Sequence, residues 1–318
     1  MKLMKKKVFI DGSSGTTGLR IFERFSVRDD IELIKIDEAD RKDPQVKKKL
    51  MNGADIVFLC LPDDAARESV SLIDNEKVIV LDTSTAHRTD PEWVYGIPEL
   101  NAGQRDRIRQ AKRIAVPGCY ATGFISMCNP LVAGGIMPAD YPVVTYAISG
   151  YSGAGKKAIE QYESAGRDKE LDAPRVYALT QQHKHLKEMQ KITGLADTPI
   201  FTPMVCDYYS GMVVCLPLYT KLLNGTQTPE TIHKYLTEYY KDQQFIGVMP
   251  FGTEAQTNGF LSGNSRSGWD GLDIYVTGND ERIQITACFD NLGKGASGAA
   301  IQCMNIVLGC DESKGLNL

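Results

Sequence analysis

The sequence predicts an α/β protein in which a doubly wound parallel sheet is interrupted by an inserted α+β domain with a mixed sheet. Strand and helix patterns alternate over the first third of the chain, as expected for a parallel sheet with helices on both faces. After about residue 130, strands separated by turn signals predominate, which favours a mixed or antiparallel sheet. The 318 residues also exceed what one hydrophobic core usually serves, so two domains are expected.

The first third of the chain supplies the elements of the parallel sheet. The run at 54–62 is apolar almost throughout, like a strand that is buried on both faces. Asp63 and Asp64 suit the N-cap and first turn of the next helix, and Asn101 suits the N-cap of a later one. The expected strands are residues 7–12, 31–37, 54–62, 77–85 and 113–118, and the expected helices are residues 16–25, 44–52, 63–74 and 101–113.

The rest of the chain supplies the inserted domain and a final helix. Apolar helices are expected at 120–135 and 296–310, and the second of these is expected to return to the first domain. We therefore expect residues 1–117 and 294–318 to form one domain and residues 118–293 the other. The remaining expected elements are helices at 185–194 and 228–242, and strands within 141–155, 200–223, 271–280 and 282–293.

Composition narrows the class of protein. A net charge of −4, with 42% hydrophobic and 24% charged residues, indicates a soluble globular protein without a field for nucleic acid or an acidic membrane. No apolar run is long enough to span a membrane, and the basic first residues lack the apolar core of a signal peptide. We therefore expect a cytoplasmic protein. Its eight scattered cysteines, without a C-x-x-C pair, argue against disulfides and a zinc site there.

A glycine-rich turn joins the first predicted strand to the first helix. Its spacing is G-x-x-G-x-x-G, not the commoner G-x-G-x-x-G, and no G-K-S/T marks a P-loop. Glycines let the backbone approach a phosphate, and a helix N-terminus offers N–H groups to it. We expect a dinucleotide site in the first domain, the alternative being a tight connection that binds nothing. The expected contacts in the turn are Gly12, Ser14, Gly15, Thr16, Thr17 and Gly18.

Charged residues after the second predicted strand bear on the choice of cofactor. Asp37 ends that strand, where an acidic residue would bond the ribose 2′-hydroxyl of NAD. Arg41 and Lys42 follow and could instead pair with the 2′-phosphate of NADP. Most such charges are simply solvated. These residues by themselves leave the choice between NAD and NADP open.

Cys119 stands where a strand gives way to a helix. Pro117 and Gly118 end the preceding apolar run, and an apolar helix pattern begins directly behind the cysteine. A helix N-terminus stabilises a thiolate, and the carboxyl edge of an open α/β sheet is where ligands bind. We therefore expect Cys119 to be a nucleophile acting beside a nicotinamide. The alternative is a small buried core residue.

Two histidines close together are candidates for an acid/base. His183 and His185 lie at the predicted junction of a loop and a helix, and Glu188 follows three residues after His185. Imidazole exchanges protons near neutral pH, so one of the pair could face a reaction site. A pair on the surface is the alternative. A metal site is not expected, because no H-E-x-x-H motif or further ligand set is present.

Two loops are candidates for holding an anion. Arg88 follows the strand at 77–85, and its guanidinium fork suits phosphate geometry. An exposed loop arginine is the alternative. Residues 149–155, SGYSGAG, could present backbone N–H groups to an anion or form a flexible turn.

Eight stretches of the sequence carry a resemblance to one family: GSSGTTGLRI, CLPDDAARE, DTSTAHRT, YGIPEL, PGCYATGF, SGYSGAGK, HKHLKE and NLGKGASGAAIQ. They run from residue 12 to about residue 302 and cover nearly the whole chain. They resemble the N-acetyl-γ-glutamyl-phosphate reductase family in its shorter bacterial form. The resemblance implies the fold of aspartate-semialdehyde and glyceraldehyde-phosphate dehydrogenases. It also implies NADPH-dependent reduction of N-acetyl-γ-glutamyl phosphate to N-acetylglutamate 5-semialdehyde and phosphate, through a cysteine thioester, in arginine biosynthesis.

The resemblance also assigns roles to single residues. Cys119 becomes the nucleophile, and His185, the second histidine of an H-x-H-x-x-E motif, becomes the acid/base. The family uses NADP, which favours Arg41, whereas Asp37 departs from the pattern and leaves NAD as the second choice. Longer members carry H-R-H where this chain has H-K-H, a change not expected to affect the catalytic histidine. The other implied roles are substrate binding by Arg88, Ser149, Gly150 and Glu188, and cofactor binding by Gly12, Ser14, Gly15, Thr16, Thr17, Gly18, Asp37, Arg41, Ser84 and Asn291.

Three other functions share part of this pattern. Aspartate-semialdehyde dehydrogenase uses the same chemistry, but YGIPEL and HKHLKE favour the reductase. A thiol hydrolase or acyltransferase would leave the glycine-rich turn and NLGKG without a role, and a dinucleotide sensor would not need Cys119. The expected partners are an acyl phosphate, a semialdehyde and inorganic phosphate, with no nucleic acid or membrane. The second domain, which carries the catalytic residues, is also expected to form a homodimer or homotetramer.

Overall fold

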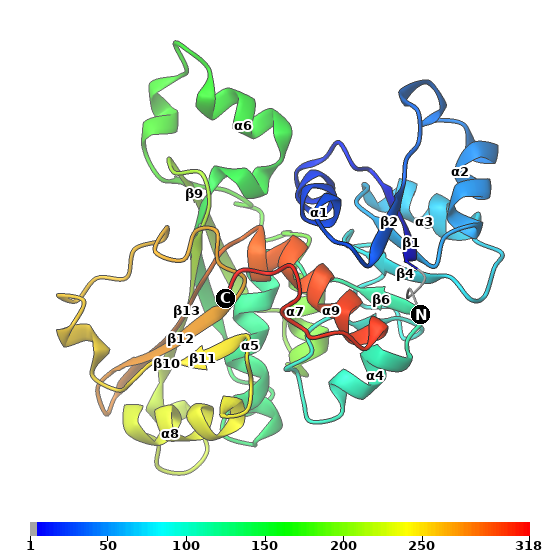
Figure 1. Cartoon of the computed structure of the whole chain (residues 1–318). Coiled ribbons are helices and arrows are strands. Elements are labelled where there is room, and N and C mark those ends of the chain that lie inside the picture. Colours follow the sequence, from blue (N-terminus) through cyan, green and yellow to red (C-terminus); the bar gives the residue numbers. More distant parts are fainter. Residues whose placement is uncertain (1–4) are drawn as a thin grey trace. The chain divides into compact units, whose positions relative to one another are not determined.

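The computed structural model describes residues 5–318, which form two compact units (Figure 1). Unit 1 comprises residues up to Pro98, Gly103–Pro117 and Ala296–Leu316. Unit 2 comprises Glu99–Ala102, Gly118–Gly295 and Asn317–Leu318. Among the described residues, no helix is long and apolar enough to cross a membrane.

Unit 1 is built on a six-stranded sheet in which every pairing is parallel. Its strands are β1 (Lys6–Asp11), β2 (Ile31–Ile34), β3 (Ile56–Leu59), β4 (Ile79–Asp82), β5 (Val94–Tyr95) and β6 (Arg113–Ala115), and its helices are α1 (Thr16–Ser26), α2 (Pro44–Asn52), α3 (Asp63–Ser71), α4 (Gln104–Gln110) and α9 (Gly298–Leu308). The strand order is β2-β1-β3-β4-β6-β5. β1 lies second from one edge, with β2 on one side and the later strands on the other, which confirms the predicted doubly wound sheet.

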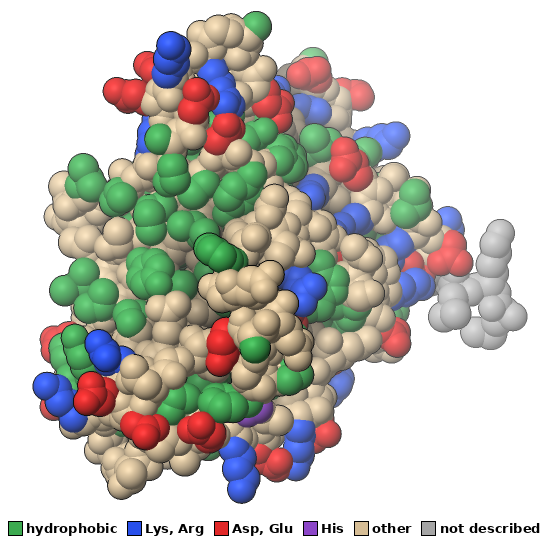
Figure 2. Space-filling view, turned by 90° about the vertical axis from the view of Figure 1, so that its left-hand side faces the viewer, with side chains coloured by type: hydrophobic (Ala, Val, Ile, Leu, Met, Phe, Trp, Pro, Cys, Tyr) green, Lys and Arg blue, Asp and Glu red, His purple; other side chains and the backbone are tan. Residues whose placement is uncertain are grey.

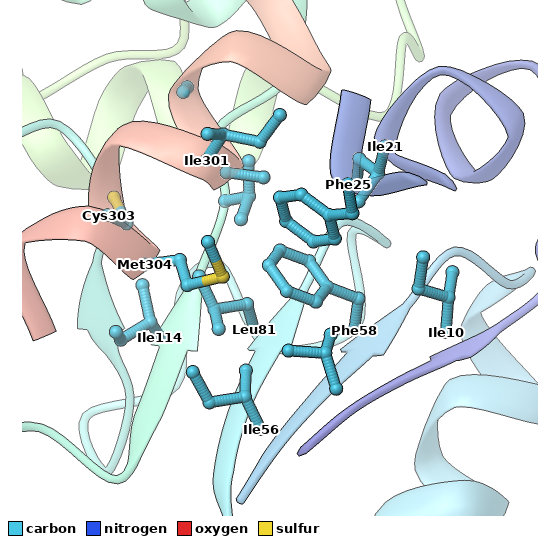
Figure 3. Packing of buried hydrophobic residues seen from close by; sticks show 14 of the residues in the cluster. Ile10, Ile21, Phe25, Ile56, Phe58, Leu81, Ile114, Ile301, Cys303 and Met304 are labelled. Carbon is cyan, nitrogen blue, oxygen red and sulfur yellow. The ribbon is translucent and has the colours of Figure 1, made fainter. Parts of the chain in front are cut away.

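Alternate residues of each strand in unit 1 enter two different cores. On one face, Phe58 of β3 packs with Phe25 of α1, their ring centroids 5.4 Å apart, and with Ile301 and Met304 of α9 (Figure 3). On the other face, Val57 of β3 joins a second cluster that includes side chains of α2 and α3. Both faces of the sheet are therefore covered, and α9 supplies part of one of the two cores.

Unit 2 is built on a seven-stranded mixed sheet, which confirms the predicted class of the inserted domain. Its strands are β7 (Val144–Gly150), β8 (Arg175–Val176), β9 (Ile200–Cys206), β10 (Met212–Tyr219), β11 (Ile246–Val248), β12 (Leu272–Gly278) and β13 (Arg282–Phe289), and its helices are α5 (Cys119–Ala133), α6 (Lys156–Glu163), α7 (Leu186–Thr193) and α8 (Pro229–Tyr240). The order is β11-β12-β13-β10-β7-β9-β8. Helix α5 packs on β10 and β13, and α8 packs on β11 and β12.

Some local predictions were wrong. Helix α4 begins at Gln104 with Gly103 as its N-cap, so Asn101 is not the cap. Helix α3 has Pro62 as its N-cap, and the Asp63 carboxylate instead accepts hydrogen bonds from the backbone and hydroxyl of Thr85. Both aspartates still lie in the first turn, where the helix dipole favours them. Helix α6 was not expected; it spans eight residues, of which only Tyr162 is buried.

Candidate active site

Two glycines of the turn between β1 and α1 are required by the packing of the chain. Gly12 has φ +87°, and a Cβ there would lie 2.3 Å from the carbonyl oxygen of Cys60. A Cβ on Gly18 would lie 2.4 Å from the carbonyl oxygen of Gly12. Any side chain at these positions would separate α1 from the strand ends. Their first role is therefore the close approach of helix and sheet.

Gly15 is different, because the protein itself does not fill the space beside it. Its φ of −77° suits any residue, and a Cβ would be 3.5 Å from the carbonyl oxygen of Gly12, an ordinary contact. Gly15 is the N-cap of α1, which has no side-chain cap and no acidic residue in its first turn. This arrangement leaves backbone N–H groups at a positive helix end, which suits the phosphates of a dinucleotide.

A pocket of about 350 Å³ extends from the glycine-rich turn to the end of β2. Ser13, Ser14 and Arg41 line it, with apolar side chains of β1, α1 and β2. Arg41 follows a short 3₁₀ helix, Glu38–Asp40, and its Nη1 lies 3.9 Å from a carboxylate oxygen of Glu38. Asp37 is the exposed N-cap of that 3₁₀ helix. The residues present therefore fit a nucleotide cofactor, with the Arg41 guanidinium in the lining of the pocket.

The loop after β4 is organised by a buried carboxylate that sequence reasoning missed. Asp82 accepts hydrogen bonds from the backbone N–H of Ser84 at 2.9 Å and from its hydroxyl at 2.7 Å. The same carboxylate lies 2.7 Å from Nδ1 of His87, whose ring stacks on Trp93 at 4.2 Å. The hydroxyl of Ser84, expected to contact the cofactor, thus donates within its own loop. The only sequence signal was an aspartate at a strand end.

Arg88 lies in the same loop and is buried. Its Nε donates to the carbonyl of Val116 and its Nη2 to the carbonyl of Thr83, both at 2.9 Å. These bonds fix the guanidinium and join the loop to the segment directly after β6. That segment leads through Pro117 and Gly118 to Cys119.

In unit 2, Cys119 is the first residue of α5 and is half-buried. Gly118, its N-cap, is extended, and its N–H donates to a carboxylate oxygen of Glu188 at 3.2 Å. Glu188 lies in α7 and is 1% exposed. The first turn of α5 itself holds no acidic residue, so the positive end of the helix dipole lies at the thiol.

His183 and His185 lie beside Tyr120, the residue that follows Cys119. His185 is the buried N-cap of α7, and its backbone N–H donates to Nδ1 of His183 at 3.1 Å. Their rings meet edge to face at 4.6 Å. The ring of Tyr120, the residue after Cys119, lies 5.7 Å from His183 and 5.9 Å from His185. The structure therefore places both histidines beside the residue that follows Cys119.

Burial raises the pKa of five other thiols. Desolvation raises the pKa of Cys60, Cys128 and Cys288 to about 12. It also raises the pKa of Cys206 and Cys215. These five side chains are protonated at neutral pH and unsuited to nucleophilic attack.

The other predicted contacts in unit 2 lie around the end of β7. A Cβ on Gly150 would lie 2.6 Å from the carbonyl oxygen of Tyr209, and the Ser149 hydroxyl donates to the carbonyl of Gly150 at 3.0 Å. The buried Asn291 amide accepts from the N–H of Gly211 at 2.8 Å and donates to the hydroxyl of Ser152 at 3.0 Å. Asn291 therefore joins the turn after β13 to the loop after β7.

Sequence reasoning missed a close approach between a later glycine and Cys119. A Cβ on Gly295 would lie 2.9 Å from Cβ of Cys119. Gly295 belongs to a π-helical turn, Gly293–Ser297. Such turns occur frequently at functional sites. Its glycine-rich sequence, NLGKGASG, was the available signal.

Family models match both parts of the chain. Residues 7–111 match the NAD binding domain of semialdehyde dehydrogenase, and residues 119–291 match its dimerisation domain. Among solved structures, aspartate semialdehyde dehydrogenase from Francisella tularensis superposes with a TM-score of 0.72 at 15% identity, over 95% of this chain and 100% of that one. The enzyme from Candida albicans, solved with NADP, gives 0.63 at 16% identity, over 96% and 98%. These likenesses establish the fold.

Curated relatives are much closer in sequence. N-acetyl-gamma-glutamyl-phosphate reductase 2 of Nostoc sp. is 45% identical over 98% of this chain and 99% of its own length. The enzyme of the same name from Pseudomonas putida is 45% identical over 97% and 98%. N-acetyl-gamma-glutamyl-phosphate reductase of Brucella suis is 44% identical over 96% and 100%. With both domains matched and these identities over nearly its full length, the chain belongs to the N-acetyl-gamma-glutamyl-phosphate reductase family of the semialdehyde dehydrogenases.

Proposed function

We propose that this protein reduces N-acetyl-γ-glutamyl phosphate to N-acetylglutamate 5-semialdehyde and phosphate, with NADPH, in arginine biosynthesis. The observation that carries the chemistry is Cys119 at the N-terminus of α5, next to a tyrosine ring that contacts both His183 and His185. The names of the full-length relatives support the substrate. The cytoplasm is the proposed compartment, since its reducing conditions keep Cys119 as a thiol.

The steps follow from the groups present. The thiolate of Cys119 attacks the acyl carbon, the carbon–oxygen bond to phosphate breaks, and a thioester forms. Bound NADPH supplies the hydride that reduces this thioester. His185 gives a proton to the oxygen of the resulting thiohemiacetal and takes it back as the carbon–sulfur bond breaks and the aldehyde leaves. Glu188 fixes the peptide before Cys119 through the Gly118 N–H.

The proposed substrate ligands are Arg88, Ser149, Gly150 and Glu188. Arg88 has the charge for the phosphate, and its bonds to Val116 and Thr83 hold it in one orientation. NADPH is proposed over NADH because Arg41 lines the pocket next to the glycine-rich turn, whereas Asp37 caps the neighbouring 3₁₀ helix. Within residues 5–318, no group of three or more His, Cys, Asp or Glu side chains is arranged to hold a metal ion.

A homo-oligomer is proposed to form through the sheet face of unit 2 opposite α5. Val144 of β7 pairs with Ile200 of β9, and both are exposed. Tyr146, two positions after Val144 in β7 and therefore on the same face of the sheet, lines a pocket of about 300 Å³ with Cys215 and Tyr275. Figure 2 shows apolar side chains gathered on one side of the molecule. The family model for residues 119–291 is a dimerisation domain, which supports a dimer or tetramer.

The proposed function is tested in the direction of aldehyde oxidation. NADP and phosphate are mixed with the protein and either N-acetylglutamate 5-semialdehyde or aspartate semialdehyde, and absorbance of the reduced nicotinamide is followed. The acetylated aldehyde is expected to give the higher kcat/KM, and Cys119→Ser is the matched control for uncatalysed reduction. A higher kcat/KM with aspartate semialdehyde would assign the rival activity. Ester hydrolysis without nicotinamide reduction would indicate a thiol hydrolase.

A further inference from the structure

A fully buried ion pair lies behind the turn that contacts Cys119. Lys294 and Glu99 are 195 positions apart, and the Lys294 Nζ lies 2.9 Å from each carboxylate oxygen. Their side chains are 1% and 0% exposed. The Nζ also lies 5.0 Å from the ring centroid of Phe245. Two charges are costly to remove from water, so the pair calls for a reason beyond simple stability.

One side of the pair is attached to the nucleophile's helix. The carbonyl of Leu100, the residue after Glu99, accepts from the Asn129 amide of α5 at 3.0 Å and from the Tyr239 hydroxyl at 2.6 Å. The hydroxyl of Tyr240 donates to the Ser126 carbonyl of α5. Burial is the main cause of the raised pKa of this phenol, and the charge of Glu99 is one of the smaller causes, so Glu99 lies close to Tyr240. Glu99 is therefore held in place relative to α5, the helix that begins at Cys119.

The other side of the pair is the turn against the thiol. Lys294 immediately precedes Gly295, where a Cβ would lie 2.9 Å from Cβ of Cys119. Asp290 holds the start of this turn: its carboxylate accepts from the N–H groups of Leu292 and Gly293, and its carbonyl accepts from the N–H of Gly295. Asp290 thus fixes the start of the turn, and the ion pair with Glu99 fixes the turn at Lys294.

We propose that the Lys294–Glu99 ion pair is a positioning pair that holds the Gly295 backbone against Cys119 and so keeps the thiol in its reactive orientation. The contacts form a closed path from α5 through Leu100, Glu99, Lys294 and Gly295 back to Cys119. Neither charge reaches the reacting atoms in this proposal. The pair acts on the reaction only through the turn, and the inference rests on the proposed role of Cys119 as nucleophile.

The test separates positioning from stability. Lys294→Met or Glu99→Gln alone leaves a buried charge and is expected to lower Tm by about 10 °C or more, whereas the double variant is expected to recover most of that loss. Despite its recovered Tm, the double variant is expected to show kcat lowered by about tenfold or more, because small misplacements of reacting groups are costly. KM for NADPH is expected to stay unchanged, and alkylation of Cys119 by iodoacetamide is expected to slow.

The matched control is Arg266→Met with Asp273→Asn, which removes another ion pair of unit 2 with a largely buried carboxylate. This control is expected to change Tm without changing kcat or the alkylation rate. If the Lys294/Glu99 double variant does not fold, the Glu99→Asp variant tests the proposal instead. It keeps both charges but shortens the side chain at position 99 by one methylene, so that the carboxylate no longer reaches Lys294 in the same way. Wild-type kcat and alkylation rate in whichever of these variants folds would overturn the proposal. Alkylation needs no substrate, so a wild-type protein inactive with both semialdehydes would refute the proposed function separately.

Discussion

The three glycines after β1 are expected to respond differently to the same added methyl group. Gly12→Ala must adopt φ +87° with its Cβ 2.3 Å from the Cys60 carbonyl oxygen. The backbone strain costs about 1–2 kcal/mol and the overpacking about 1–3 kcal/mol. A loss of about 3 kcal/mol lowers Tm by roughly 10 °C. Gly18→Ala has only the collision with the Gly12 carbonyl, partly offset by alanine's helix propensity, so about 1–2 kcal/mol is expected.

Gly15→Ala is the informative variant. Its φ of −77° is compatible with alanine and its nearest contact would be 3.5 Å, so only the poorer N-cap costs stability, about 1 kcal/mol at most. The methyl group would occupy the space next to the N–H groups of α1 that a dinucleotide phosphate needs. A loss of at least tenfold in NADPH affinity is expected, equivalent to about 1.4 kcal/mol.

The assay combines thermal unfolding by circular dichroism with fluorescence titration of NADPH on each variant. The expected pattern is a large loss of Tm for Gly12→Ala and a large loss of affinity with near-normal Tm for Gly15→Ala. Wild-type NADPH affinity in Gly15→Ala would show that the turn does not hold the phosphates. Wild-type Tm in Gly12→Ala would refute the packing argument.

Further predictions concern the thiol, the histidines and the cofactor's ribose. Cys119→Ser is expected to abolish turnover while NADPH still binds by fluorescence titration, because a serine hydroxyl stays protonated at neutral pH; substantial turnover would exclude the thioester. His185→Asn is expected to lower kcat by about two to four powers of ten and His183→Asn by much less, as measured in parallel pH–rate profiles; equal losses would leave the acid/base unassigned. Arg41→Ala is expected to lower the affinity for NADPH by about one to two powers of ten and to leave the affinity for NADH unchanged, whereas Asp37→Ser is expected to raise the affinity for NADPH. Titration of both variants with both cofactors measures these changes, and an equal loss of affinity for both cofactors in Arg41→Ala would favour NAD.

Much of the fold could be predicted because its signals are local. The continuous apolar run at β3 and the glycine-rich turn before α1 reflect burial and backbone geometry within a few residues. The predicted start of α4 was wrong because Asn101 and Gly103 are both acceptable N-cap residues. Packing decides between them, and the helix begins after Gly103. Helix α6 spans eight residues and buries only Tyr162, so no apolar run marks it in the sequence.

The contacts that complete the site were hidden because they join distant parts of the chain. Glu188 meets the Gly118 N–H across 70 positions, and Lys294 meets Glu99 across 195. Sequence spacing can propose that a glutamate near a histidine matters, as it did for Glu188. It cannot show which peptide that carboxylate reaches, since the tertiary fold decides the partner.

Cys119 lies in a different backbone setting from Cys60 and Cys288. Cys60 directly follows β3 and Cys288 lies within β13, and burial raises the pKa of both thiols to about 12. Cys119 begins a helix instead: β6 ends at Ala115, Pro117 has no N–H to donate to a sheet, and α5 starts directly behind Gly118. The same backbone break leaves the Gly118 N–H to Glu188 and brings Tyr120 to the histidine pair. The short Pro-Gly-Cys sequence thus sets where α5 begins and places Cys119 at its first position.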